Sequence, residues 1–320
     1  MSVDDSQYAA VSFVDIDSET AGQRIDNFLL SRLKGVPKSR IYRLLRKGEV
    51  RVNKGRIKPE YRLLAGDQLR LPPIRVAERG APPPASQGLR SELLSSIVRQ
   101  NDDWLVLNKP SGLAVHGGSG VSLGAIEALR NIWPDARHLE LVHRLDRDTS
   151  GCLLITKKRA ALKDLQEQMR AGSITKKYLA LVVGNWPKGL TVVDAPLLKN
   201  TLSSGERVVR ADSAGKAAVT HFKVLKAFAG FTLLEVTLET GRTHQIRVHC
   251  QLMGHPIAGD PKYGDKADNK TFKTLGLKRL FLHAAKLGFK DPLTAERLVC
   301  EAPLPEELDR VLTNLPGVGC

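Results

Sequence analysis

The chain has 320 residues, of which 42% are hydrophobic and 26% charged, the composition of a folded chain with a sizeable apolar core. Its longest apolar run has six residues, at 178–183, far fewer than a membrane-spanning helix needs, so we expect no membrane partner. The 49 Lys and Arg side chains exceed the 34 Asp and Glu side chains and give a net charge of +15, which favours a polyanionic partner.

The positive charge is concentrated in the first quarter of the chain. Residues 24–79 contain 16 Lys and Arg and five Asp and Glu, a net charge of +11, which leaves +4 for the other 264 residues. Prolines cluster at 72–73 and at 82–84, and proline-rich runs form semi-rigid spacers. We therefore predict a small basic domain over residues 20–80, a linker over 81–95 and a larger domain over 96–320.

Within the basic domain, the segment PKSRIYRLLRKG predicts an amphipathic helix. Pro37 suits the first turn of this helix, and Gly48 suits a left-handed residue at its end. The apolar side of the helix would consist of Ile41, Leu44 and Leu45. A second side would be cationic, with Arg40, Arg43 and Lys47 at positions i, i+3 and i+7. An isolated stripe of this kind is usually a solvated surface, but the surrounding positive charge favours a surface that binds phosphates.

Residues 23–71 resemble the S4 RNA-binding domain. The resemblance rests on the opening GQRIDNFL, on PKSRIYRLLRKGEVRVN and on the closing AGDQLRL. It implies a small α–L fold that binds RNA, and the RNA-binding residues that we expect on it are Arg40, Arg43, Lys47 and Lys54. S4 domains occur in proteins with unrelated chemistry, so this part of the chain implies binding and no reaction.

The larger domain begins with a predicted buried strand at 104–107. The loop that follows, SGLAVHGGSG, has neither the GK[ST] ending of a P-loop nor a GxGxxG helix start, which argues against a nucleotide cofactor. The four cysteines stand far apart without a CxxC pair, and the histidines lack metal-ligand spacing, so we expect no metal. Free thiols and an N-terminus without a secretory signal lead us to expect a cytoplasmic protein.

Polar side chains are densest in the segment LVHRLDRDTSGCLLITKK, at 141–158. Apolar segments flank this polar string, an arrangement that places charged groups at the mouth of a site. If residues 143–147 are extended, Arg144 and Asp146 share one face. Neighbouring guanidinium groups favour the ionised form of a carboxylate, which suits a nucleophile or an electrostatic stabiliser. The alternative is a structural network of Arg and Asp, and the local spacing does not decide between the two.

Two further segments have residues of interest. The sequence LEVTLETGRTHQIRVHCQLM predicts a strand, a turn and a helix at about 243–252. One side of that helix contains His244, Arg247 and Gln251, and its arginine can pair with a buried carboxylate from elsewhere in the fold. The sequence KKYLALVVG predicts a strand that contains Tyr178. Such a tyrosine is usually a core residue, but an RNA enzyme also needs an aromatic platform for an unstacked base.

Together these segments resemble the motif set of the RluA-type pseudouridine synthases. The resemblance covers residues 20–305 and rests on NKPSGLAVH, HRLDRDTSG, KKYLALVVG and TGRTHQIRVH. It implies an α+β fold with a mixed, largely antiparallel sheet around a catalytic cleft. It also implies that Asp146 is the essential aspartate and that Arg247 pairs with it. Tyr178 would stack on the target uracil, and Arg144 would enter the space that the flipped base leaves.

The implied reaction converts uridine in RNA to pseudouridine. The C1′–N1 glycosidic bond breaks, the base turns, and C1′ bonds to C5. This isomerisation is redox-neutral, so we predict no cofactor. Asp146 would either attack C1′ directly or remove a proton from the ribose, and the sequence leaves both routes open.

The N-terminal segments narrow the expected substrate. GQRIDNFL, LKGVPKSRIYRLLRKGEVRVNK and RIKPEY are most similar to family members that modify 23S ribosomal RNA. The expected partner is therefore 23S ribosomal RNA or a precursor of the large subunit, bound by a monomer. Two alternatives stay open: a pseudouridine synthase for transfer RNA or another ribosomal site, and a non-catalytic S4-type protein for RNA binding or ribosome assembly. A pure binding protein has no need of HRLDRD and GRTHQIR together.

Overall fold

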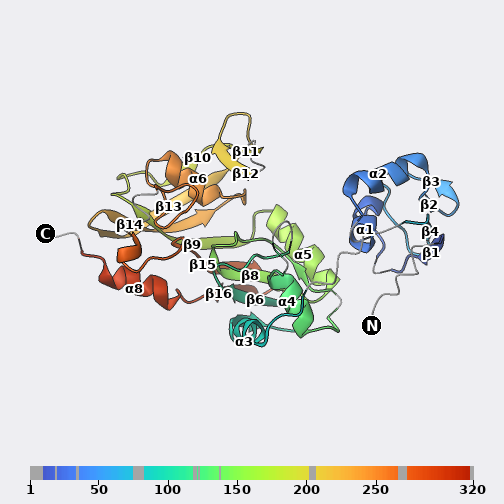
Figure 1. Ribbon diagram of the computed structural model, residues 1–320, viewed down its shortest axis with the longest axis horizontal. Coiled ribbons are helices and arrows are strands. Elements are labelled where there is room, and N and C mark those ends of the chain that lie inside the picture. Colours follow the sequence, from blue (N-terminus) through green and yellow to red (C-terminus); the bar gives the residue numbers. More distant parts are fainter. Residues whose placement is uncertain are drawn as a thin grey trace. The chain divides into compact units, whose positions relative to one another are not determined.

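The computed structural model describes residues 10–18, 20–33, 36–74, 83–117, 121, 123–136, 138–201, 207–265 and 272–317. The chain divides into two compact units, the N-terminal unit Met1–Ala81 and the C-terminal unit Pro82–Cys320 (Figure 1). Each unit has a hydrophobic core of its own, so each can be described by itself.

The N-terminal unit combines two helices with a small antiparallel sheet. The helices are α1 (Ile25–Arg32) and α2 (Lys38–Lys47). The strands, in spatial order, are β1 (Ser12–Asp15), β4 (Gln68–Leu71), β2 (Arg51–Val52) and β3 (Gly55–Arg56). Apolar side chains of both helices and of the sheet meet in one core, in which Phe28 of α1 and Leu69 of β4 are buried.

Helix α2 confirms the predicted amphipathic helix. It begins directly after Pro37 and ends at Gly48, which has the left-handed conformation, with φ of 68°. The three apolar residues predicted for its inner side are buried: Ile41, Leu44 and Leu45. Strands β2 and β3 are joined by Asn53 and Lys54, whose φ values are 48° and 68°. Two consecutive positive φ angles are typical of a tight two-residue hairpin turn.

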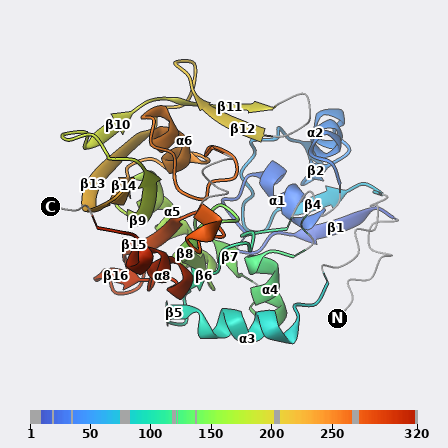
Figure 2. The same cartoon turned by 60° about the vertical axis from the view of Figure 1, so that its left-hand side comes forward.

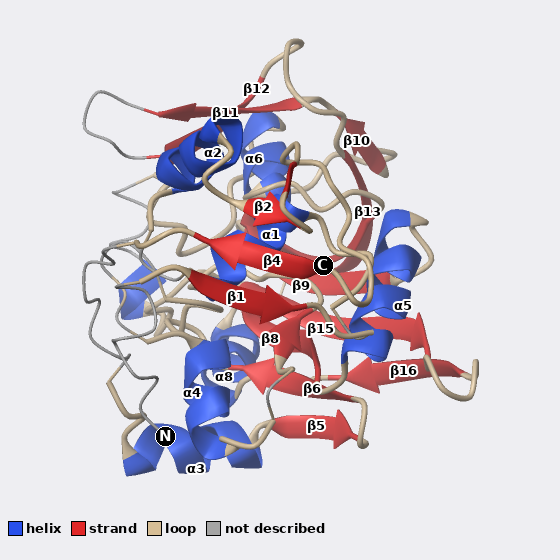
Figure 3. Cartoon of the chain, turned by 90° about the vertical axis from the view of Figure 1, so that its right-hand side faces the viewer, coloured by secondary structure: helices blue, strands red, loops and turns tan. Residues whose placement is uncertain are grey.

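The C-terminal unit is built around a ten-stranded sheet (Figure 3). Its main path runs in the order β10 (Val192–Asp194), β13 (Val219–Phe228), β14 (Phe231–Leu238), β9 (Thr175–Val183), β15 (Leu282–Lys290), β8 (Ser150–Thr156), β6 (Trp104–Lys109) and β5 (Ile97–Gln100). Strand β16 (Arg297–Glu301) pairs with β15, and β7 (Glu140–Leu141) pairs with β8. All pairs are antiparallel except β8 with β15. The sheet is mixed and largely antiparallel, as the resemblance implied.

Helices and a separate hairpin surround this sheet in the described part of the unit. The helices are α3 (Gln87–Ser95), α4 (Ala125–Ile132), α5 (Arg159–Arg170), α6 (Gln245–Leu252) and α8 (Glu306–Asn314). The hairpin consists of β11 (Leu197–Thr201) and β12 (Arg207–Ala211). Helix α3 lies beside α4, and α6 lies against β12 and β13 (Figure 2). Across the described residues, no helix has the length and apolar character that crossing a membrane requires.

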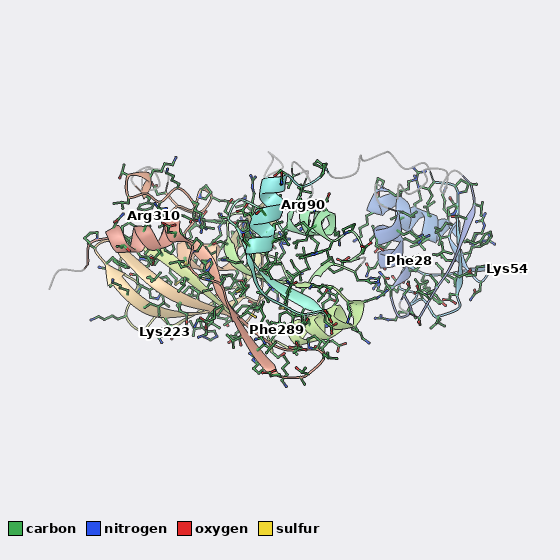
Figure 4. All side chains as sticks on the ribbon, turned by 90° about the horizontal axis from the view of Figure 1, so that it is seen from below. Phe28, Lys54, Arg90, Lys223, Phe289 and Arg310 are labelled. Carbon is green, nitrogen blue, oxygen red and sulfur yellow. The ribbon has the colours of Figure 1, made fainter. Side chains whose placement is uncertain are left out.

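The middle of the sheet is buried on both faces. In β6, Trp104 and Val106 belong to one apolar cluster, whereas Leu105 and Leu107 belong to another. The first cluster also contains Phe289 of β15, whose ring lies 4.9 Å from that of Trp104 in an edge-to-face arrangement (Figure 4). Alternate residues of a strand point to opposite faces, so a continuous apolar segment is what a strand covered on both sides requires. The buried strand predicted at 104–107 is confirmed.

Part of the segment predicted as a linker is helical. Its residues 81 and 82 lie outside the described residues, and its residues 87–95 form α3. The Ser86 hydroxyl accepts a hydrogen bond from the Leu89 N–H at 3.2 Å, and Leu93 is buried in the core of the C-terminal unit. Serine is common in linkers but is also a preferred helix N-cap, so composition alone does not distinguish a linker from a helix start here. The other predicted domain limits stay predictions.

Candidate active site

One pocket in the C-terminal unit brings the polar segments of the sequence together. It has a volume of about 520 Å³, including its open mouth. Its lining comes from the loop between β7 and β8, from β9 and from the segment that leads into α6. The four residues that the resemblance implied for the cleft all lie in this lining: Arg144, Asp146, Tyr178 and Arg247.

The loop that contains Asp146, residues 142–149, is held in place by a buried lysine. The amino group of Lys109, at the end of β6, donates hydrogen bonds to the carbonyl oxygens of Pro110 and Leu113, both at 2.8 Å. It donates a third to the carbonyl oxygen of Arg147 at 3.1 Å. Lys109 is completely buried, and this burial lowers its pKa to about 7. Its three carbonyl acceptors match the three N–H donors of an ammonium group and tie the two loops together.

The loop that contains Asp146 ends in a turn at residues 146–149, and residues 143–147 do not form a strand. The N–H of Thr149 donates to the carbonyl oxygen of Asp146 at 3.2 Å, which closes the turn. The Ser111 hydroxyl donates to the carbonyl oxygen of Asp148 at 2.7 Å and so holds the turn against the neighbouring loop. The second contact joins residues far apart in the sequence and fixes the position of this turn.

Two apolar features complete the positioning of the loop. Leu145 is buried in the core, which anchors the chain between Arg144 and Asp146. At the start of β8, Gly151 has φ of 109°, and a Cβ atom there would lie 2.3 Å from the carbonyl oxygen of Ala284. Only glycine fits this close approach of β8 to β15, so the point at which the loop enters the sheet is fixed.

Arg247 lies on α6 and contacts two carboxylates. Its Nε donates to Asp260 Oδ2 at 2.7 Å, and its Nη2 donates to Asp260 Oδ1 at 2.8 Å. Its Nη1 is 3.4 Å from Asp146 Oδ2. The expected contact between Arg247 and Asp146 is therefore present, but the two short hydrogen bonds of the guanidinium go to Asp260, which the sequence analysis did not identify.

Asp260 is buried, and both of its carboxylate oxygens are engaged in hydrogen bonds, so it is not available to react. Its carboxylate is completely buried, and Oδ1 also accepts hydrogen bonds from the backbone N–H groups of Lys262 at 2.8 Å and Tyr263 at 3.0 Å. Burial alone would raise the pKa of Asp260, but the hydrogen bonds and charge of Arg247 hold it below its ordinary value. The Arg247 guanidinium also lies 5.0 Å from the centre of the Tyr263 ring, a cation–π contact. This carboxylate fixes the arginine.

Asp146, in contrast, is sparsely bonded. Its side chain is 18% exposed, and its contacts with Arg247 at 3.4 Å and with His244 Nε2 at 3.8 Å both involve the same oxygen, Oδ2. Two cationic or hydrogen-bonding groups thus stabilise one side of the carboxylate, while the group stays accessible from the pocket. A carboxylate of this kind is available to react.

Tyr178 and Arg144 occupy opposite environments in the lining. Tyr178 is buried in β9, where it pairs with Val236 of β14, and it belongs to the main core cluster. Burial raises the pKa of Tyr178, and the nearby charge of Asp146 raises it further, so its hydroxyl is neutral. Arg144 is exposed. The pocket therefore combines a fixed aromatic wall with a cation that is free to reorient.

The turn that leads into α6 is held by Gln245. Its Oε1 accepts hydrogen bonds from the Thr240 hydroxyl at 2.8 Å and from the N–H of Arg242 at 2.9 Å. Its Nε2 donates to the carbonyl oxygen of Val219 at 3.0 Å and to the Thr220 hydroxyl at 2.9 Å. The helix begins at Gln245, two residues later than predicted, because these side-chain bonds stabilise a non-helical turn before it.

Among the described residues, no three or more His, Cys, Asp or Glu side chains form a group that could hold a metal ion. His249 shows where an α6 histidine is used. Its Nδ1 hydrogen-bonds with the Thr220 hydroxyl at 2.9 Å, and its Nε2 donates to the carbonyl oxygen of Ala195 at 3.0 Å. One ring nitrogen therefore links α6 to β13, and the other links it to the segment between β10 and β11.

The RNA-binding residues predicted for the N-terminal unit lie on α2 and on the β2–β3 turn. Arg43, Lys47 and Lys54 are exposed, and Arg40 is half-buried. Within the described chain, none of these four side chains makes an ion pair or a hydrogen bond. Their charges are available to an outside partner.

Comparison with known families identifies both units. Residues 23–69 match the S4 domain family, and residues 103–252 match the family described as RNA pseudouridylate synthase. The second match includes the Asp146 loop, β9 and α6. A solved structure, human RNA pseudouridylate synthase domain containing 4, is 30% identical and covers 71% of this chain and 95% of its own, with a TM-score of 0.58.

Curated relatives match over nearly the whole chain. Ribosomal large subunit pseudouridine synthase C of Pasteurella multocida (strain Pm70) is 57% identical over 307 residues, which are 96% of this chain and 94% of the relative. The protein of the same name from Escherichia coli (strain K12) is 57% identical over 309 residues, which are 96% of this chain and 97% of the relative. The chain belongs to the RNA pseudouridine synthase family and is an RNA-modifying isomerase with an S4 domain.

Proposed function

We propose that this chain isomerises uridines of 23S ribosomal RNA, either in the free RNA or in a precursor of the large subunit. The substrate is inferred from the two relatives described above, which are named as pseudouridine synthases of the large ribosomal subunit. The S4 domain and the charge of +15 support an RNA substrate of this size, because contacts with many phosphates supply affinity.

The observation that carries the proposal is the position of Asp146. It is the only carboxylate among the described residues that line the pocket. Its Oδ2 faces Arg247 and His244, so we assign Oδ1 to the substrate. In the proposed reaction Asp146 either attacks C1′ or removes a ribose proton. In both routes the bond from C1′ to N1 breaks, the uracil turns, and C5 bonds to C1′. C5 loses its proton and N1 gains one, while Asp146 is regenerated when its bond to C1′ breaks or when the ribose proton is returned.

Base flipping gives roles to two other residues of the lining. A uridine must leave its stack before C1′ can reach Asp146, at a cost of a few kcal/mol. We assign Tyr178 to stack on the extruded uracil, because its ring belongs to the rigid core of the sheet. We assign Arg144, exposed in the pocket lining, to occupy the vacated space in the RNA. Arg247 is the third catalytic residue, as the fixed cation beside Asp146.

RNA affinity is proposed to come from the N-terminal unit. Arg43, Lys47 and Lys54 have no partner within the described chain, and Lys54 stands at the surface of this unit (Figure 4). Arg40, on the same helix, completes the proposed contact surface. We further propose that the protein acts as a monomer in the cytoplasm, where ribosomal RNA is made. Light scattering of the purified protein checks the oligomeric state.

The experiment uses protein-free 23S RNA and maps pseudouridine by carbodiimide-dependent primer-extension stops. Wild type is expected to give stops at discrete uridines. Asp146→Asn, nearly isosteric, is expected to give none while it binds RNA with wild-type affinity. Asp148→Asn is the matched control, since its side chain lies two residues away and outside the pocket lining.

Each outcome has a definite meaning. Stops on transfer RNA or 16S RNA, and none on 23S RNA or its precursor particles, would overturn the substrate. Stops that survive in Asp146→Asn and vanish in Asp148→Asn would overturn the catalytic carboxylate. Tight binding without stops on any RNA would favour a non-catalytic binding protein.

A further inference from the structure

His244 has an unusual backbone for its residue type. It precedes α6 with φ of 55° and ψ of 21°, the left-handed conformation. In the described chain, the other non-glycine residues with positive φ are Asn53, Lys54 and Ala295, of which the first two form a hairpin turn and the third lies in an exposed turn. His244 instead lines the pocket. A non-glycine residue held in this conformation costs free energy, and such residues cluster at functional sites.

The side chain of His244 is oriented by Tyr263. Its Nδ1 lies 2.7 Å from the Tyr263 hydroxyl, and that hydroxyl accepts a hydrogen bond from the N–H of Val209 at 3.2 Å. A phenolic oxygen that already accepts one hydrogen bond can direct its own proton to His244 Nδ1, and in that arrangement the ring proton of a neutral imidazole lies on Nε2. Nε2 is the nitrogen that lies 3.8 Å from Asp146 Oδ2.

The surroundings favour the neutral form of this imidazole. Burial lowers the pKa of His244, and Arg247 and Lys262 lower it further, against the opposing effects of Asp146 and Asp260. Tyr263 is the remaining titratable group in contact with the ring. At neutral pH the ring therefore faces the carboxylate as an N–H donor without a charge of its own.

We propose that His244 is a positioning residue that, together with Arg247, holds Oδ2 of Asp146 so that Oδ1 is presented to the substrate. Two donors converge on one oxygen from different directions, at 3.4 Å from Arg247 and 3.8 Å from His244. Such contacts are often long in the free enzyme and shorten in the complex. The left-handed backbone is what brings the ring of a residue before α6 into reach of both Tyr263 and Asp146. The inference rests on the proposed role of Asp146 as the reacting carboxylate.

Two amide variants separate the two ring nitrogens. Glutamine places its amide nitrogen near the position of Nε2, whereas asparagine reaches only the position of Nδ1 and tolerates the left-handed backbone. We expect His244→Gln to keep kcat within about tenfold of wild type and His244→Asn to lose roughly 10- to 100-fold in kcat with KM unchanged, the loss typical of one hydrogen bond to a charged group. His244→Asn should retain the melting temperature of wild type, which excludes misfolding.

The opposite pattern would overturn the inference. If His244→Asn keeps kcat and His244→Gln loses it, the imidazole serves only to link α6 to Tyr263. Wild-type kcat in both variants would show that neither nitrogen acts on Asp146. Because wild-type turnover is measured in the same assay, failure of this inference is distinguished from failure of the proposed function.

A measurement without RNA tests the tautomer directly. The ¹⁵N chemical shifts of the His244 ring in the full chain at neutral pH should show a neutral ring with its proton on Nε2. Tyr263→Phe keeps the ring beside Arg247 but removes the hydroxyl, and we expect it to weaken this tautomer preference and to lower kcat. A wild-type proton on Nδ1 would contradict the proposal, whatever RNA is used in the activity assay.

Discussion

On α2 of the N-terminal unit, Arg43 and Lys47 are exposed and make no ion pair with any described residue. On α6 of the C-terminal unit, the Arg247 side chain is 5% exposed and contacts two carboxylates. Both helices are short and both contain arginine, yet the environments differ in dielectric and in partners. Exposed charges interact through water and are screened by salt, whereas buried charges must be paired within the protein.

Exposed charges are suited to bind an outside partner, whereas buried charge pairs stabilise the site from within. The cations of α2 cost nothing to leave at the surface and suit a polyanion that approaches from solvent. Arg247 is costly to bury, and Asp260 offsets that cost with two short hydrogen bonds. The same arginine then has Nη1 left for Asp146. A pair of buried charges thus supports a third charge that remains reactive.

The N-terminal unit has a buried carboxylate of its own, which sharpens the comparison. Asp26 is buried at the start of α1 and accepts hydrogen bonds from Arg24 at 2.7 Å and from the Tyr42 hydroxyl at 2.8 Å. Tyr42 belongs to α2, so the contact ties the two helices together. Asp26 does not line the pocket described above. A buried pair of Asp and Arg is therefore not by itself a sign of an active site. The distinguishing feature is a neighbouring carboxylate with few hydrogen bonds, which here is Asp146.

The largest expected effect comes from breaking the buried pair of the C-terminal unit. Asp260→Asn leaves the Arg247 guanidinium without its charged partner, and we expect a loss of about 3–5 kcal/mol in the free energy of unfolding. Urea unfolding of the full chain measures it. Asp146→Asn is the matched control, with a long, partly exposed contact, and should change the free energy of unfolding by less than about 1 kcal/mol while it abolishes turnover. Equal losses in the two variants would contradict the division of roles between the two carboxylates.

A smaller effect is expected on the pH dependence of the free energy of unfolding. The pKa values of Asp260 and Asp26 are held below their ordinary values in the folded protein. Folding therefore favours their ionised forms, and the stability that they contribute is complete above about pH 4, the unfolded pKa, and is lost as pH falls through the folded pKa. The stability difference between wild type and Asp260→Asn should shrink as pH is lowered from 5 to 3. Asp26→Asn provides the same test in the N-terminal unit. A difference independent of pH would show that these carboxylates act through packing and not through charge.

Much of this comparison could be predicted from local sequence. Helix α2 follows from Pro37, Gly48 and an apolar stripe at helical spacing, all of which depend on neighbours within one or two turns. The convergence of the polar segments on one pocket was implied by the resemblance, and the mixed sheet with it. The two-residue turn at Asn53 and Lys54 follows in part from Asn53, a residue type that tolerates positive φ.

The rest depends on contacts that the local sequence does not encode. Asp260 lies in GDPKYG, which indicates only a turn, and nothing there shows that its carboxylate reaches Arg247 on another element. The left-handed His244 violates its own propensity because Tyr263 and the pocket hold it. The turn after Asp146 is held by Lys109 and Ser111, which donate hydrogen bonds to the carbonyl oxygens of Arg147 and Asp148. Such long-range hydrogen bonds decide geometry wherever local preferences are weak.

The smallest expected effect lies on the α2 surface. We expect the double variant Arg43→Ala with Lys47→Ala to lower the slope of log affinity for RNA against log salt by about 0.7–0.9 for each side chain removed. Stability should change by no more than about 0.5 kcal/mol, because both side chains are exposed. Filter binding from 50 to 300 mM salt measures the slope. Arg310→Ala is the control for net charge, since Arg310 of α8 is 69% exposed (Figure 4). If Arg310→Ala lowers the slope as much as removal of one α2 side chain does, RNA affinity depends on the net charge of the protein and not on contacts with α2. If only the α2 substitutions do so, phosphates contact that helix, and exposed cations without partners are the ones that bind.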